Sequence, residues 1–196
     1  MCNEAARRIS LGLLRDDWSE TRIPLTFPEG LPNMAPLDGF RITDSTVIIR
    51  GVDGRAAPAE LVTRRWSWPG SHGKPVYNFR SDGRTLTHGR CLIPVDAFYE
   101  FTAPADAKAK RKTKWAFRLA DHDWFCIAGL WRSDAAVGEA FTMLTCPPGA
   151  DIAPYHSRQV VALGRDLWAA WLDPATPSAE LCRPLAAGSL HVEQVA

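Results

Sequence analysis

The chain has 196 residues, of which 46% are apolar and 23% charged, and its formal net charge is +1. This length and composition predict one soluble domain with a sizeable core over residues 1–196. The longest apolar stretch, "WFCIAGLW" (124–131), is too short to span a bilayer, and charged residues interrupt the first thirty positions. We therefore expect a cytoplasmic protein, monomeric and without a membrane partner.

The pattern of apolar residues predicts many short strands and few helices. A helix is expected first, in "EAARRISLGLLRDD" (4–17), with Asn3 as its N-cap. Strands are expected in "TVIIRGV" (46–52), "ELVTRRW" (60–66), "RCLIPVDAFYEF" (90–101), "KWAFRLA" (114–120), "WFCIAGLWR" (124–132), "AFTMLTC" (140–146) and "RQVVAL" (158–163). Helices follow in "RDLWAAWLD" (165–173) and "SAELCRPLA" (178–186). The order predicts an α+β fold with a largely antiparallel, barrel-like sheet core and a few flanking helices.

The cysteines argue against a disulfide framework and against a structural metal. They number five, and no two have zinc-ligand spacing: Cys2, Cys91, Cys126, Cys146 and Cys182. Cys91 and Cys126 lie in apolar runs, where a thiol behaves as a small buried hydrophobe. Cys2 has no such setting. We expect no metal and no cofactor, and we treat Cys2 as a candidate for chemistry.

Charge is unevenly distributed along the chain. Residues 50–118 hold 14 Lys or Arg against 6 Asp or Glu, together with nine of the aromatic residues. Cations for phosphates and rings for unstacked bases are what a single-stranded nucleic-acid groove needs. A strand-rich core with solvated charges between its strands explains the same composition. The run "KAKRKTK" (108–114) is expected to be an exposed hairpin loop.

Polar residues interrupt several apolar or turn-like stretches. Asn78 and Arg80 lie in "PVYNFRSD", Glu100 ends "IPVDAFYE", and His156 with Arg158 interrupts "APYHSRQVVAL". A carboxylate among aromatic rings is costly unless it is paired or functional, so Glu100 is the strongest candidate of these. Structural roles for Asn78 and His156 remain open on this ground alone.

Taken together these segments resemble the SOS response-associated peptidase (SRAP) family of abasic-site processing proteins. The resemblance rests on Met1-Cys2, "NFRSD" (78–82), "RCLIPVDAFYEF" (90–101) and "HSRQVV" (156–161), in the family order, and on further similarity at "LPNMAP" (31–36) and "RRWSWP" (64–69). It departs from the family's pattern at Asn3-Glu4, Phe79, Asp82, Ala97 and Val160-Val161. These departures bear on the shape of a DNA channel and on the turn after Cys2 more than on the reaction.

The resemblance implies site residues and a partner, single-stranded DNA that contains abasic sites. It implies chemical roles for Cys2, Asn78, Glu100 and His156. Arg80 and Arg158 are expected to bind phosphates, Trp66 and Trp68 to stack on bases or act as a wedge, and Asn33 to contact DNA. The two tryptophans are equally well explained as core rings.

Cys2 becomes a 1,2-aminothiol if Met1 is removed. Its α-amine, with a pKa near ~8, is neutral far more often at pH 7 than a lysine amine and forms an imine with an aldehyde more readily. The adjacent thiol can then close a thiazolidine ring, with a large effective molarity. An Asn3-capped helix would additionally favour the thiolate and depress the pKa of the amine.

Three hypotheses of different class follow. The first is a covalent shield for abasic sites in single-stranded DNA, with possible lyase activity. The second is a peptidase or amidohydrolase with an N-terminal Cys nucleophile. The third is a non-catalytic single-strand-binding module, which would have no use for a cysteine at position 2.

Overall fold

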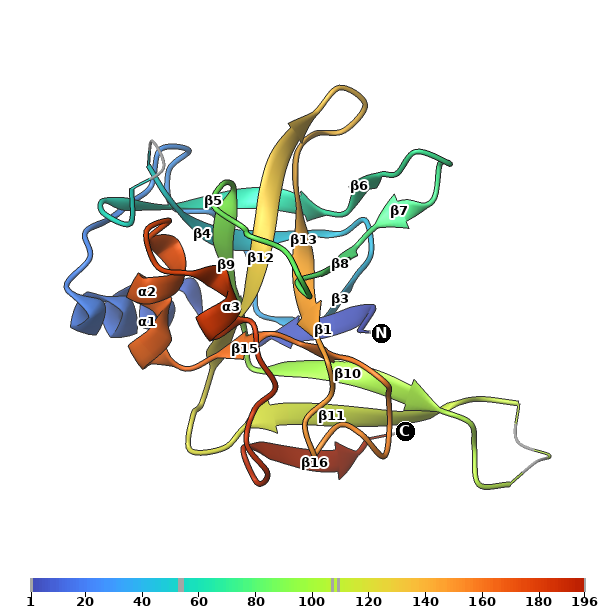
Figure 1. Ribbon diagram of the computed structural model, residues 1–196. Helices are drawn as coiled ribbons and strands as arrows, with labels where there is room; N and C mark the ends of the chain where they lie inside the picture. The colour runs from blue at the N-terminus through green and yellow to red at the C-terminus, as the bar shows by residue number, and fades with distance from the viewer. Residues whose placement is uncertain (1, 53–54, 107, 109, 196) are drawn as a thin grey trace.

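Two β-sheets that share a hydrophobic core form the centre of the molecule in this computed structural model, which describes residues 2–52, 55–106, 108 and 110–195 (Figure 1). The first sheet has five strands, in the spatial order β16 (Leu190–Gln194), β11 (Thr113–Leu119), β10 (Ala97–Thr102), β1 (Glu4–Arg7) and β3 (Leu37–Arg41). All its pairings are antiparallel.

The second sheet has nine strands and crosses above the first in Figure 1. Its main path runs β14 (Gln159–Val160), β13 (Gly138–Cys146), β12 (Phe125–Asp134), β9 (Arg90–Val95), β4 (Ser45–Gly51), β5 (Ala59–Trp66) and β2 (Leu25–Thr26). Off this path, β15 (Ala162–Leu163) pairs with β12 and β8 (Asn78–Arg80) pairs with β13. A separate ribbon joins β6 (Trp68–Pro69) to β7 (Pro75–Val76).

Helices are few and short, and they lie together on one side of the nine-stranded sheet (Figure 1). They are α1 (Leu11–Trp18), η1 (Ser19–Thr21), η2 (Arg165–Leu167), α2 (Trp168–Leu172) and α3 (Ser178–Leu181). The α+β class with a largely antiparallel, barrel-like sheet core is therefore confirmed. The expected helix over 178–186 ends early, at Leu181.

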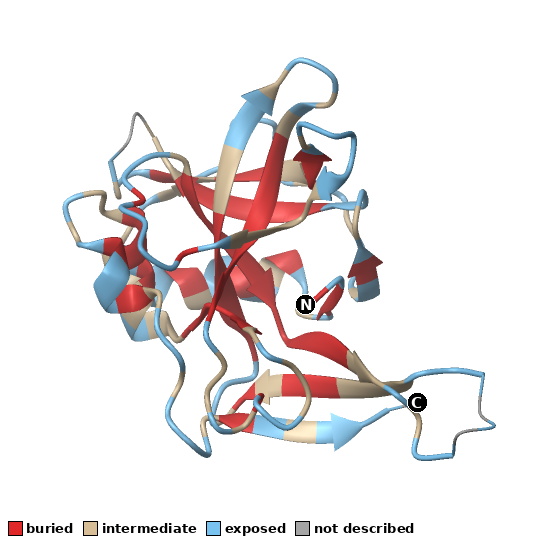
Figure 2. Cartoon of the chain, turned by 45° about the vertical axis from the view of Figure 1, so that its right-hand side comes forward, coloured by how far each residue is buried: buried red, intermediate tan, exposed pale blue. Residues whose placement is uncertain are grey.

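Side chains along the central strands alternate between two faces, and this alternation divides the hydrophobic core into two layers. In β9, Cys91 and Ile93 face the layer between the two sheets, whereas Leu92 faces the layer under the helices. In β12, Ile127 and Cys126 divide in the same way. Side chains of successive strand residues point to opposite faces, so a strand covered on both faces reads as a continuous apolar run. Figure 2 shows these strands as the buried centre of the molecule.

The first expected helix is wrong over its first half. Residues 4–7 form β1, whose Ala5 pairs with Phe98, and all four of its residues are buried. Helix α1 begins only at Leu11, where the Ser10 side chain accepts a hydrogen bond from the Leu13 N–H at 3.2 Å. Tertiary pairing overrides the helical propensity of the alanines. Asn3 precedes a strand and caps no helix.

The segment "RCLIPVDAFYEF" is two strands in different sheets, where one was expected. Strand β9 belongs to the nine-stranded sheet and β10 to the five-stranded sheet. Asp96 lies between them; its N–H donates to the Ala6 carbonyl at 3.0 Å, and its carboxylate pairs with Arg8. This corner carries the chain from one sheet to the other, so residues after Asp96 face the inter-sheet layer from the opposite side.

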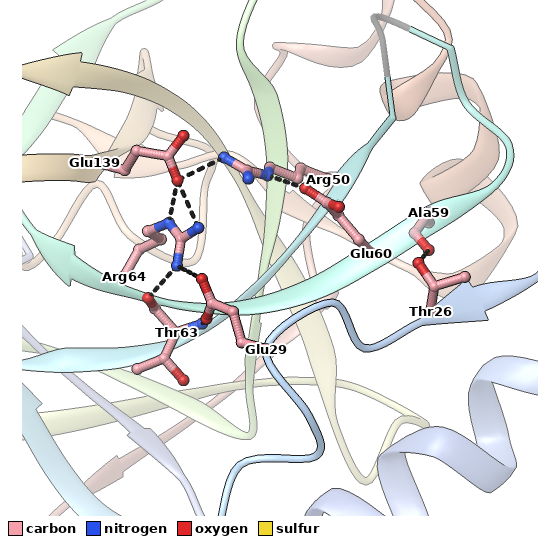
Figure 3. A network of polar contacts seen from close by, with 8 residues as sticks. All are labelled: Thr26, Glu29, Arg50, Ala59, Glu60, Thr63, Arg64 and Glu139. Atoms are coloured by element: carbon pink, nitrogen blue, oxygen red, sulfur yellow. Dashed lines mark hydrogen bonds and ion pairs between the residues drawn. The ribbon is translucent and has the colours of Figure 1, made fainter.

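An ion network ties three strands of the nine-stranded sheet and a loop together (Figure 3). Arg50 of β4 pairs with Glu60 at 2.6 Å and with Glu139 at 3.1 Å. Arg64 of β5 also pairs with Glu139, and with Glu29 at 2.6 Å. The Arg50 guanidinium lies 3.8 Å from the ring centroid of Trp131 in β12. These arginines are bound within the fold and are not available to a ligand.

Candidate active site at the start of the chain

Cys2 lies in the inter-sheet core, directly before β1, with 1% of its surface exposed. Its Sγ donates a hydrogen bond to the Glu4 carbonyl at 3.3 Å. Burial, with the negative charge of Glu100 in addition, raises the pKa of the Cys2 thiol to about 12. The expected helix dipole is absent here, and the expectation of a depressed thiol pKa is wrong.

Glu100 faces the same layer from the neighbouring strand β10, with 3% of its surface exposed. Burial raises the pKa of Glu100 to about 7, against a smaller opposing effect of a hydrogen bond from the backbone N–H of Cys2. Desolvation therefore moves Glu100, which the sequence places among aromatic rings, toward neutrality. At neutral pH the group exists in both protonation states, as a general acid or base requires.

Asn78 reaches Cys2 from the other sheet. It lies in β8, which pairs in parallel with β13 so that Asn78 is opposite Met143. Its Nδ2 donates to the Cys2 carbonyl at 2.7 Å. Its Oδ1 is buried and accepts no hydrogen bond from the described residues. An unsatisfied buried acceptor is costly, and this one belongs to the amide group that holds the Cys2 carbonyl.

His156 ends a tight turn after β13. Its Nδ1 lies 3.0 Å from the backbone nitrogen of Arg158, and burial lowers the pKa of His156 below the ordinary value. The preceding residue, Tyr155, packs against Trp115 with ring centroids 4.8 Å apart. Trp115 is the cross-strand partner of Glu100. Tyr155 thus docks the His156 turn on the sheet that carries Glu100, a role that its sequence position did not suggest.

Two arginines, one in β8 and one directly before β14, differ in their environments. Arg158 is held inside the molecule, donating to the Thr145 carbonyl at 2.8 Å and pairing with Asp82, whose pKa it lowers. Arg80 lies opposite Thr145 in the β8–β13 register, but its side chain is exposed and contacts no acidic group among the described residues. Thr145 thus contacts both segments: it pairs with Arg80 across the strands and accepts a hydrogen bond from Arg158. Nothing in the local sequence predicted this role.

Comparison with known proteins identifies the family. The sequence profile of "SOS response associated peptidase (SRAP)" matches residues 74–196. The chain belongs to the SRAP family. The matched region includes Asn78, Glu100 and His156, three of the four residues of the candidate site.

A protein of known name and several solved structures are similar to this chain. The "Abasic site processing protein YoaM" of Bacillus subtilis is 28% identical over 107 residues, which cover 52% of this chain and 45% of that protein. A solved protein of Bacteroides thetaiotaomicron has a TM-score of 0.73 at 15% identity, covering 100% of this chain and 92% of the other. One of Bordetella bronchiseptica has a TM-score of 0.70 at 22% identity, with both chains fully covered.

The two tryptophans expected to meet DNA are core residues in this SRAP domain. Trp66 is fully buried; its Nε1 donates to the Tyr77 carbonyl at 2.8 Å and its ring stacks with Phe141. Trp68 is 6% exposed, and the guanidinium of Arg132 lies 4.5 Å from its ring centroid. Neither ring offers a face on which a base could stack, so the core interpretation holds. Asn33 is exposed, in the loop before β3.

The basic segment of residues 50–118 does not form a continuous basic surface. Arg90 is buried and donates to the carbonyls of Leu86, Asp173 and Thr176. Lys114 pairs with Glu4 at 2.7 Å. Together with the ion network of Figure 3, these contacts remove several cations from solvent. The exposed ones include Arg80 and the described cations of the β10–β11 loop, namely Lys108, Lys110, Arg111 and Lys112.

Two further properties concern only the part of the chain that the structure describes. It holds no group of three or more His, Cys, Asp or Glu side chains arranged to bind a metal ion. It also contains no helix that could cross a membrane, since even α1 has only eight residues.

Proposed function

We propose that this SRAP protein forms a covalent thiazolidine crosslink, through Cys2, with abasic sites in single-stranded DNA. Family membership and the name of the B. subtilis relative support a role in the DNA-damage response. One observation carries the finer proposal: the backbone nitrogen of Cys2 donates a hydrogen bond to the carboxyl group of Glu100. After removal of Met1, which lies outside the described residues, this nitrogen is the α-amine.

The amine would attack the aldehyde carbon of the ring-opened sugar and give a carbinolamine. Glu100, with its pKa raised to about 7 by burial, can take a proton from the amine and return it to the departing hydroxyl. One water leaves and an imine forms. The Cys2 thiol then adds to the imine carbon, and its proton passes to the nitrogen. The ring closes with no oxidant or reductant.

The remaining residues would hold the reactants in place. Asn78 fixes the Cys2 carbonyl with its Nδ2 and has a buried Oδ1 left to accept a hydrogen bond from the sugar. His156, kept neutral by burial, would exchange protons with the carbinolamine and assist reversal. Arg80 would bind a flanking phosphate, as would Asn33 in its exposed loop, whereas Arg158 chiefly positions the His156 turn.

The environment of the thiol argues against the peptidase hypothesis. A cysteine peptidase attacks as a thiolate, and such thiols have depressed pKa values. Burial instead raises the pKa of the Cys2 thiol to about 12. Imine chemistry begins at the amine and needs no thiolate in its first step. A simple binding module would not require a buried carboxyl group beside Cys2.

Intact-mass spectrometry with an oligonucleotide that contains one abasic site tests the proposal. We expect the protein to lack Met1 and to form an adduct whose mass is the sum of both components less one water. A protein that lacks Met1 and gives no adduct would contradict the proposal. Cleavage of peptide substrates without any adduct would support the peptidase in its place.

A further inference from the structure

A cavity of about 380 Å³ lies at the end of the five-stranded sheet, on the face opposite to Glu100. Its lining consists of Asn3, Glu4, Arg41, Ile42 and Phe101. Strand β1 begins at this end, and its two antiparallel neighbours, β3 and β10, finish there. Asn3 follows Cys2 directly, so the cavity adjoins the residue that would carry the adduct.

The lining combines a ring with polar groups that can reach a ligand. Phe101 is half-buried on the outer face of the sheet, opposite to the face of Glu100. The Asn3 side chain is exposed, and 72% of the Arg41 side chain is exposed. Aromatic side chains are platforms for unstacked bases, and Asn and Arg recognise purine edges by paired hydrogen bonds.

The acidic residue of the lining is already neutralised. Glu4 is 6% exposed and pairs with Lys114 at 2.7 Å and with Arg41 at 3.4 Å. Its carboxylate occupies the space beside Gly39, where an added Cβ would lie 2.8 Å from Oε1. Glu4 therefore fixes the floor of the cavity, and it does not present an unpaired negative charge to a nucleotide.

We infer that this cavity binds the base of the nucleotide next to the abasic sugar, with a preference for a purine. Because Asn3 follows Cys2 where β1 begins, a strand whose sugar reaches the Cys2 nitrogen can turn over this end of the sheet and bring its neighbouring base to Phe101, Asn3 and Arg41. The inference rests on the proposed function, because Cys2 fixes where the abasic sugar lies. Asn3, at which the chain departs from the family's pattern, becomes a specificity residue.

The test uses pyrimidine oligonucleotides with one abasic site whose 5′ or 3′ neighbour is a purine, a pyrimidine or a base-free tetrahydrofuran. We expect a purine neighbour, on either the 5′ or the 3′ side, to crosslink about 10-fold faster than a base-free neighbour on the same side. The rates are measured at limiting protein concentration. Phe101→Leu should abolish this difference in rate, whereas Phe101→Tyr should retain it. Phe27→Leu, a half-buried ring near α1, is the matched control and should change nothing.

Asn3→Gly should lower the preference for purine over pyrimidine, and Asn3→Gln should retain part of it. Equal rates for all neighbours on both sides in the parent protein would overturn the inference while leaving the crosslink intact. Fluorescence anisotropy on oligonucleotides with a tetrahydrofuran in place of the abasic site separates the two ideas. A purine-dependent affinity that Phe101→Leu removes, without any crosslink on true abasic DNA, would contradict only the proposed function.

Discussion

Asn78 donates from Nδ2 to the carbonyl of Cys2 at 2.7 Å, although 76 residues separate the two in the chain. This contact joins the nine-stranded sheet to the first residues of the chain and fixes the peptide group that follows the proposed nucleophile. It also leaves the Asn78 Oδ1 buried without a partner among the described residues. A ligand that donates a hydrogen bond to such a buried acceptor gains binding free energy, because it satisfies an atom that is otherwise unpaired.

Asn78→Ala should slow crosslinking more than it destabilises the fold. One lost hydrogen bond costs about 1–2 kcal/mol of unfolding free energy, whereas a displaced reacting group can cost about 100-fold in rate. Urea denaturation and gel-based crosslinking time courses measure the two quantities. A rate that falls only in proportion to the unfolded fraction would show that Asn78 is structural.

Cys2→Ala, with Met1 removed, should separate the two steps of the reaction. The amine of the variant can still form an imine, which borohydride traps, but no thiol is present to close the ring. We expect trapped adducts and no heat-stable crosslink on denaturing gels. Cys182→Ala is the matched control, since that thiol is only partly buried and lies far along the chain. A heat-stable crosslink in Cys2→Ala would exclude the thiazolidine.

Glu100→Gln should change the pH dependence of stability. Burial raises the pKa of Glu100 from 4.5 to about 7, so the folded chain keeps a proton that the unfolded chain loses between these values. The contribution of Glu100 to the unfolding free energy therefore falls as pH rises through this window. Glu100→Gln cannot lose a proton, so its unfolding free energy lacks this decrease. Denaturant titrations above pH 7 should therefore show a higher unfolding free energy, relative to the parent, than at low pH.

The same variant should slow adduct formation by roughly 10²–10⁴-fold, the usual contribution of a general acid or base. In the parent, the rate should decline on both sides of the apparent pKa, near 7, because both protonation states take part. Crosslinking rates across this range check the prediction. A normal rate in Glu100→Gln would remove the carboxyl group from the mechanism.

His156→Ala should act mainly on reversal. Burial lowers the pKa of His156, which favours a neutral ring, and its Nδ1 lies 3.0 Å from the backbone nitrogen and 3.2 Å from the carbonyl oxygen of Arg158. We expect release of a preformed crosslink to slow by roughly 10²-fold or more, with a smaller effect on formation than in Glu100→Gln. His191→Ala, an exposed residue of β16, is the control. Equal reversal in both variants would contradict the assignment.

Arg80→Ala should weaken binding to single-stranded DNA without destabilising the fold. One lost phosphate contact reduces the slope of log affinity against log salt by about 0.7. Arg158→Ala should instead lower stability, since it leaves Asp82 unpaired and removes the donors to Thr145. Arg15→Ala, on the exposed face of α1, controls for loss of charge. An unchanged slope in Arg80→Ala would place the DNA path elsewhere.

Local sequence determined the strands and the chemical groups of the site. Alternation and turn residues are properties of neighbouring positions, so the segments that became β4, β5, β11, β12 and β13 could be predicted directly. Glu100 could be singled out for the same reason, because Phe98, two residues away on the same face of β10, is one of the apolar residues of its layer.

Only the tertiary structure decided where these groups meet and how they titrate. Residues 4–7 became a strand because β10 and β3 offered partners on both sides, and the same pairing buried Cys2 and raised its pKa. Trp66 entered the core because Phe141 and Tyr77 arrive there from later strands. Desolvation and strand pairing depend on segments far apart in the chain, and no window of neighbouring residues contains both.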